Sequence, residues 1–206
     1  MTADRIILFF SFAFVFFGFS KVSFGQRTTI STWSGSDDIT IRSVGMGYNS
    51  LNFNQYSNKI TANSGTIHIR KEDDNTAIFE IEAPSEFQIA VNLNYTPHLI
   101  REGEFSTDRS IPMVLHMAYH NQNAVNETVA KKESIDLPSG ITGITIPVNS
   151  KFLGTLSPSE YGGSIERPKS VVYLFVYGTL GPIRSVSAGD YSSQISIHVN
   201  VADEKN

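Results

Sequence analysis

Residues 87–94 read FQIAVNLN, and this stretch decides the fold class. Phe87, Ile89, Val91 and Leu93 take alternate positions, and polar or small side chains fill the positions between them. A period of two is typical of a β-strand with one face on a hydrophobic core. We therefore predict a half-buried strand here.

The same pattern recurs along the chain. Alternating segments at 66–71, 77–82 and 111–119 predict further strands, with weaker candidates at 39–44, 51–56, 141–148 and 151–156. Residues 171–180 (VVYLFVYGTL) are apolar on both faces, which predicts a central strand covered on each side. Turn residues at 72–75 (EDDN) predict a hairpin.

Helical spacing is not sustained anywhere. Residues 126–135 (NETVAKKESI) are the best helix candidate, although they are short and also fit an edge strand. The sequence therefore predicts an all-β fold, an immunoglobulin-like antiparallel β-sandwich of roughly 8–10 strands.

The amino terminus predicts export. Residues 6–19 form an uncharged apolar run after Arg5, shorter than the roughly 20 residues that span a bilayer. Small residues at Ser23 and Gly25 follow, as at a signal peptidase site. We predict a cleavable signal peptide at 1–25, an arm with a possible first strand at 26–44, and a sandwich domain at 45–206. The mature chain is expected in the periplasm, on the outer surface or outside the cell, without a stable membrane anchor.

Composition narrows the possible partners. The chain has no cysteine, which excludes a disulfide scaffold, and 206 residues can bury a core without one. Its 16 basic and 20 acidic side chains give a net charge of −4. Nucleic acid is not expected as a partner, because its phosphates would repel such a chain.

Three segments carry a resemblance to a known family. They are LNFNQYSNKITANSGTIHI from Leu51, TAIFEIEAPSEFQIAVNL from Thr76, and GTLGPIRSVSAGDYSSQISIHVNV from Gly178. The order resembles the bacterial domain of unknown function family 4402, a relative of spore coat protein U and pilin-type sandwiches. Asn54 stands where the family usually has glycine. The closest matches are these signature residues: Gly178, Thr179, Leu180, Ala188, Gly189 and Tyr191.

That resemblance implies an exported sandwich from a Gram-negative bacterium, with no catalytic residue to transfer. Relatives among the coat and pilin proteins build surface fibres. Assembly into a fibre is therefore an expectation by analogy of fold.

Chemical motifs are weak throughout the chain. His116 and His120 are four residues apart, but on a strand they lie about 13 Å apart, too far to share one ion. All five histidines are predicted to lie at the surface. The acidic run at 72–74 lacks the ligand spacing of a calcium loop, and no GxSxG motif occurs. We predict no catalytic, metal or cofactor residue, and no enzyme.

Two functional hypotheses remain. The first is a fimbrial- or coat-like assembly subunit, which pairs through a strand edge with itself or another envelope protein, with the segment after residue 25 as donor arm. The alternative is a monomeric module for a glycan or protein, in which Trp33 and Tyr161 are possible contacts. Trp33 lies before the first expected strand. The preferred interpretation of its ring is that it covers an open end of the sandwich.

The closing segment should be a core strand. After the turn at Gly189 and Asp190, Tyr191 begins an inward series that continues at Ile195, Ile197 and at two valines, 199 and 201. Ser193 takes one inward position. His198 should face outward.

Overall fold

The computed structural model describes residues 25–53, 65–103, 110–149, 168–183, 186 and 189–202. The predicted signal peptide, Tyr161, Ala188 and the expected strand at 151–156 lie outside these residues. The described elements are, in chain order, β1 (Gln26–Ser34), β2 (Thr40–Val44), β3 (Ser50–Asn52), β4 (Ile67–Ile69), β5 (Ala77–Pro84), β6 (Gln88–Tyr95), β7 (His98–Arg101), β8 (Ile111–His120), α2 (Glu127–Glu133), β9 (Ile135–Asp136), β10 (Gly143–Pro147), β11 (Lys169–Leu180) and β12 (Tyr191–Val201). The chain is all-β, as predicted.

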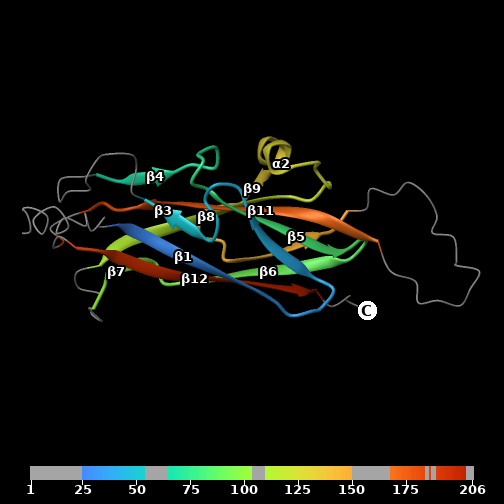
Figure 1. The fold of residues 1–206 in the computed structure, drawn as a ribbon, viewed down its shortest axis with the longest axis horizontal. Helices are drawn as coiled ribbons and strands as arrows, with labels where there is room; N and C mark the ends of the chain where they lie inside the picture. The colour runs from blue at the N-terminus through green and yellow to red at the C-terminus, as the bar shows by residue number, and fades with distance from the viewer. Residues whose placement is uncertain are drawn as a thin grey trace, which may run out of the picture.

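The strands form two sheets that share one core. The β12 sheet has the order β10–β6–β12–β1–β3, and the β11 sheet has the order β2–β5–β11–β8–β9. Strand β7 pairs with the start of β12 and with the start of β8, so it joins the two sheets at one corner. Figure 1 shows β6 and β12 on one side of β11 and the helix α2 on the other. The immunoglobulin-like assignment stays a prediction.

Alternation in the sequence becomes the core between these sheets. Ile89, Val91 and Leu93 of β6 are buried, as the opening stretch predicts. They belong to one cluster that also contains Phe79 and Ile81 of the other sheet. Burial of apolar area at about 25 cal/mol per Å² is the main force that holds the layers together.

Strand β11 is buried on both faces, which confirms the prediction for this segment. Val172, Leu174 and Val176 face the core, while Phe175 joins a second cluster on the outer face. Ala130 of α2 belongs to the same outer cluster. The helix alternative for residues 126–135 is therefore the correct one, and α2 covers the apolar outer face of β11.

The predicted hairpin at residues 72–75 is wrong. Strand β4 pairs with β11 at Ile69 opposite Gly178, and β5 resumes at Ala77 opposite Val176. Both strands therefore lie along the same edge of β11, and residues 70–76 loop out between them. Asp73 closes this loop, because its carboxylate accepts a hydrogen bond of 2.8 Å from the Arg70 backbone N–H.

The strand count is twelve in the described residues, above the predicted 8–10. Interruptions explain the difference, since β4 with β5 and β6 with β7 each follow one line beside a single neighbour. The pairing is also not wholly antiparallel. Strand β1 runs parallel to β12 from Gln26 opposite Tyr191 to Ser34 opposite Val199. Parallel pairing is available because the two strands are far apart in sequence and need no hairpin.

The closing strand has the predicted register. Tyr191, Ile195 and Ile197 are buried, and His198 lies on the outer face. Ser193 has a buried hydroxyl without a hydrogen-bond partner among the described residues.

Among all the residues that the structure describes, we find no helix long and apolar enough to cross a membrane.

Candidate functional site

The outer face of the β12 sheet presents a surface of mainly uncharged, mostly polar residues, called the polar face here. Its residues are the outward positions of four strands, all exposed or partly exposed: Arg27, Thr29, Ser31 and Trp33 of β1; Gln88, Ala90, Asn92 and Asn94 of β6; Gly143, Thr145 and Pro147 of β10; Ser192, Gln194, Ser196, His198 and Asn200 of β12. Arg27 is the only Arg, Lys, Asp or Glu among them. The face therefore offers hydroxyl and amide groups rather than charge.

One cross-strand row holds the aromatic rings of this face. Trp33 lies opposite His198, His198 opposite Asn92, and Asn92 opposite Gly143, so the row crosses four strands. With about 4.8 Å between neighbouring strands, the row is about 14 Å long. The rings of Trp33 and His198 lie 5.7 Å apart between centroids, tilted by 60°.

Gly143 leaves space for the amide at the end of the row. A Cβ atom at position 143 would come within 2.8 Å of Asn92 Oδ1, which is closer than real Cβ contacts. Glycine thus allows the Asn92 side chain to lie over β10. The amide, with two donors and a carbonyl acceptor, stays available at the surface.

Trp33 does not cover an end of the sandwich, so the preferred packing interpretation is wrong. It belongs to β1 rather than to a segment before the first strand, and 70% of its surface is exposed. The reason is the period of β1. Gln26, Thr28 and Ile30 take the inward positions, so Trp33 falls on the outward series. Tyr161, the other possible contact, lies outside the described residues.

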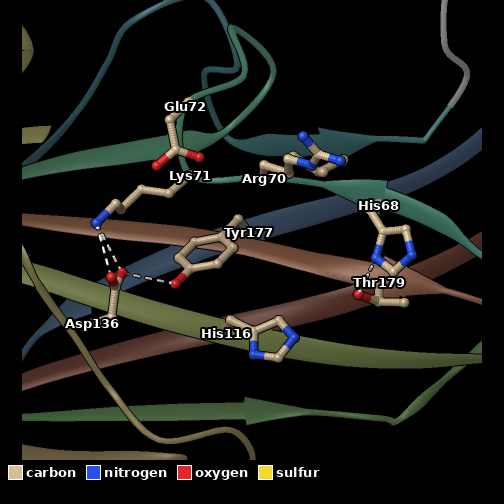
Figure 2. Close-up of a pocket in the computed structure, with 9 residues that line it drawn as sticks. His68, Arg70, Lys71, Glu72, His116, Asp136, Tyr177 and Thr179 are labelled. Atoms are coloured by element: carbon tan, nitrogen blue, oxygen red, sulfur yellow. Dashed lines mark hydrogen bonds and ion pairs between the residues drawn. The ribbon is translucent and has the colours of Figure 1, made fainter. Parts of the chain in front are cut away.

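A groove of about 400 Å³ lies on the opposite side of the molecule, over the outer face of the β11 sheet. We call it the His116 groove; Figure 2 shows the side chains around it. It is lined by His68 and Ile69 of β4, Arg70, Lys71 and Glu72 of the following loop, His116 of β8, Asp136 of β9, and Tyr177 and Thr179 of β11. The loop at 70–76, mistaken for a hairpin, supplies one wall.

One half of the groove is a closed charge network. The Lys71 ammonium lies 2.9 Å from Asp136 Oδ1, and the Tyr177 hydroxyl donates to the same oxygen over 3.0 Å. Burial, this hydrogen bond, the negative charge of Asp136 and the more distant charge of Glu72 raise the pKa of Tyr177 to about 12. Tyr177 therefore stays protonated at neutral pH, and Asp136 has both a cation and a donor beside it.

The other half of the groove holds hydrogen-bond donors. His68 Nδ1 and Thr179 Oγ1 lie 3.1 Å apart, and the His116 ring stacks on Tyr177 with 5.5 Å between centroids. Figure 2 shows Arg70, His68 and Thr179 on the side of Tyr177 away from Lys71 and Asp136. Strand register causes this grouping, since Thr179 pairs with His68 and Tyr177 pairs with His116.

His120 contradicts the prediction that all the histidines lie at the surface. It lies on the same face as His116, but α2 packs over that end of the sheet and leaves it 3% exposed. Its Nε2 atom lies 3.5 Å from Glu133 Oε2 of the helix. Within the described residues, no group of three His, Asp or Glu side chains is arranged to hold a metal ion.

The signature residues occupy structural positions rather than one site. Leu180 and Tyr191 are buried in the core, and a Cβ at Gly178 would lie 2.6 Å from the Val114 carbonyl oxygen of β8. Gly189 packs beside the Arg101 side chain. Only Thr179 lines the His116 groove.

Sequence reasoning missed the partners of Trp33 and the whole His116 groove. Alternation indicated that His198, Asn92 and His116 face outward, but it carried no information about which strands are neighbours. A scan against protein-family models gives no match, and a search of curated proteins gives none. The resemblance to family 4402 therefore stays a prediction.

Proposed function

We propose that this protein is a non-enzymatic binding module that holds a neutral polysaccharide on its polar face. The observation that carries the proposal is the Trp33 row, in which an exposed indole and an imidazole lie in line with an amide. Such rings stack against the C–H face of a pyranose. The neighbouring hydroxyl and amide groups match the donors and acceptors of sugar hydroxyls.

Charge favours a neutral polymer over an acidic one. The polar face carries a single formal charge, on Arg27, and the whole chain has a net charge of −4. An acidic polysaccharide would meet long-range repulsion without a cationic surface to offset it. The open shape of a sheet face suits an extended chain better than a small ligand, which needs a concave site.

The predicted signal peptide supports this proposal, because export would bring the polar face to the cell envelope or the medium, where polysaccharides occur. We propose that location with the function. A periplasmic and a surface location are equally compatible with a neutral glycan as partner.

Affinity electrophoresis through gels containing neutral polysaccharides tests the proposal. A panel of cellulose, mannan, xylan and starch derivatives should include at least one that retards the protein. Trp33→Ala should weaken that binding by about tenfold or more, because truncation of a central aromatic ring removes the dominant contact. Asn92→Ala should weaken it less.

Tyr48→Ala is the matched control. Tyr48 is about as exposed as Trp33 but lies in the loop between β2 and β3. Its loss should leave retardation unchanged. Retardation by no polysaccharide of the panel, or an equal effect of Trp33→Ala and Tyr48→Ala, overturns the proposal.

Assembly is a second candidate, and one observation favours it. Strand β1 places only one apolar side chain, Ile30, in the core, beside Gln26 and Thr28. Its main-chain pairing with β12 and β3 could be reproduced by a β1 from another copy through exchange. Edge pairing is a weaker route, because all four edge strands in the described residues are short: β3 and β9 have three and two residues, and β2 and β10 have five each. Sedimentation velocity at rising concentration tests it, and a monomer throughout contradicts assembly.

A further inference from the structure

The His116 groove separates its charges in a way that points to a ligand. Asp136 is neutralised by Lys71 and hydrogen-bonded by Tyr177. Those three groups form the closed half of the groove. The remaining carboxylate, that of Glu72, lies near Lys71 on the same side of Tyr177 (Figure 2).

Among the described residues that line it, the other half presents hydrogen-bond donors and no carboxylate. Arg70 is exposed, and its guanidinium forms no ion pair with any described residue. His116 carries an N–H donor in any tautomer. His68 and Thr179 are bonded to each other, so this pair adds the Thr179 hydroxyl as a donor when the His68 Nδ1 atom carries its proton. Guanidinium and N–H donors arranged around one space are the usual recognition elements for an oxyanion.

We propose that this half of the groove binds the oxyanion of a small organic acid, either a carboxylate or a phosphate ester. The volume of about 400 Å³ admits a ligand the size of one sugar residue. The Arg70 guanidinium pairs with the oxyanion, and the Thr179 hydroxyl donates a hydrogen bond to it. The rest of the ligand lies along the His116 ring. This site is separate from the polar face, which lies on the other sheet.

The test is isothermal titration of the purified protein with three probes. These are D-glucuronate, inorganic phosphate and D-glucose, the last being the uncharged counterpart of the first. Glucuronate or phosphate should bind, and glucose should not. Glucuronate alone identifies a carboxylate site on a sugar frame, whereas phosphate identifies a site for phosphorylated ligands.

Variants then assign the binding to the groove. Arg70→Gln should weaken it by about tenfold or more, because a hydrogen bond to a charged group is lost. Arg42→Gln is the matched control, since it removes the same charge from an arginine on the same sheet but outside the groove. Glu72→Gln should strengthen binding by about twofold, a gain that damage to the fold would not produce.

The result that overturns the proposal is equally definite. Each of three results excludes the proposed site. The first is that neither glucuronate nor phosphate binds, and the second is that glucose binds as tightly as glucuronate. The third is that Arg70→Gln and Arg42→Gln have the same effect on binding. None of these results bears on Trp33, so the proposed polysaccharide function stands or falls separately.

Discussion

Ile197 and His198 are neighbours in β12 with opposite environments. Ile197 is fully buried between the sheets, while His198 lies on the polar face. Ile197→Asp would place a carboxylate in an apolar core, at a cost of several kcal/mol that a marginally stable domain cannot absorb. We expect the Ile197→Asp variant to be unfolded, as measured by circular dichroism. His198→Ala should change the free energy of unfolding by less than about 0.5 kcal/mol. The opposite pattern would mean that β12 is shifted by one residue.

Ser193 is a local defect in the same strand. Its hydroxyl is buried without a hydrogen-bond partner among the described residues, in an inward series that is otherwise apolar or aromatic. Ser193→Ala removes the unpaired group and keeps the volume nearly unchanged. We expect a gain of about 1 kcal/mol in the free energy of unfolding, measured in urea. Ser192→Ala, at the exposed neighbouring position, should have no effect. A loss of stability in Ser193→Ala would show that the hydroxyl is bonded.

Single residues also show what the sequence could predict. Alternation is a local signal, so the inward positions of β6, β8 and β12 could be predicted without knowing their neighbours. Trp33 could not be placed this way, because β1 has two polar inward residues, Gln26 and Thr28, and its period is hidden. The pairing of Trp33 with His198 depends on a contact between strands 165 residues apart. The sequence of either segment alone does not indicate that these two strands are neighbours.

Among the elements, the short helix α2 stabilises the outer face of the β11 sheet. Asn126 caps it, since the Asn126 side chain accepts a hydrogen bond of 3.0 Å from the Val129 backbone N–H. The helix covers the outer cluster around Phe175. Asn126→Ala should lower the free energy of unfolding by about 1 kcal/mol. Thr128→Ala, an exposed position in the same helix, is the control and should not lower it. Equal effects of both changes would show that the cap does not stabilise the helix.

Strand β11 makes the protein sensitive to alkaline pH. Burial and a hydrogen bond to Glu80 raise the pKa of Tyr173 to about 12, and burial with the Asp136 bond does the same for Tyr177. In the unfolded chain both groups titrate near pH 10. The folded state therefore keeps protons that the unfolded state loses, so the stabilisation is complete below pH 10 and falls as the pH rises toward 12. Urea denaturation at steps of pH should show this decline. The double variant Tyr173→Phe, Tyr177→Phe should reduce it, and an unchanged decline would contradict the assignment.

The wrong hairpin at residues 72–75 and the open alternative at residues 126–135 have one physical cause. Residues 72–75 have the composition of a hairpin turn, but the loop they form returns to the same edge of β11 that it left. Turn chemistry specifies that the chain bends, and it does not specify which neighbour receives the next strand. For the same reason residues 126–135 allowed a helix or an edge strand. The apolar outer face of β11 decides between them, because the helix buries the Phe175 side chain on that face.

At the scale of the whole molecule, the two sheets turn different chemistry outward. The β12 sheet presents neutral hydroxyl and amide groups around Trp33, while the β11 sheet is partly covered by α2 and presents the His116 groove beyond it. The core separates these surfaces, so changes on one should not reach the other. The double variant Trp33→Ala, Arg70→Gln should therefore combine the effects of the single variants, within about 0.5 kcal/mol for each ligand.

The cysteine-free chain allows a direct test of whether β1 stays in its own molecule. Thr29 and Gln194 are opposite each other in the parallel pair of β1 and β12, and both are exposed. After oxidation, Thr29→Cys with Gln194→Cys should give an intramolecular disulfide and a monomer on a non-reducing gel, because β1 pairs with the β12 of its own chain. A ladder of linked oligomers would contradict this and favour assembly by exchange of β1. Mixing the two single variants separates exchange from chance collision. A Thr29→Cys to Gln194→Cys dimer that forms only after joint unfolding and refolding requires β1 of one copy to lie beside β12 of another.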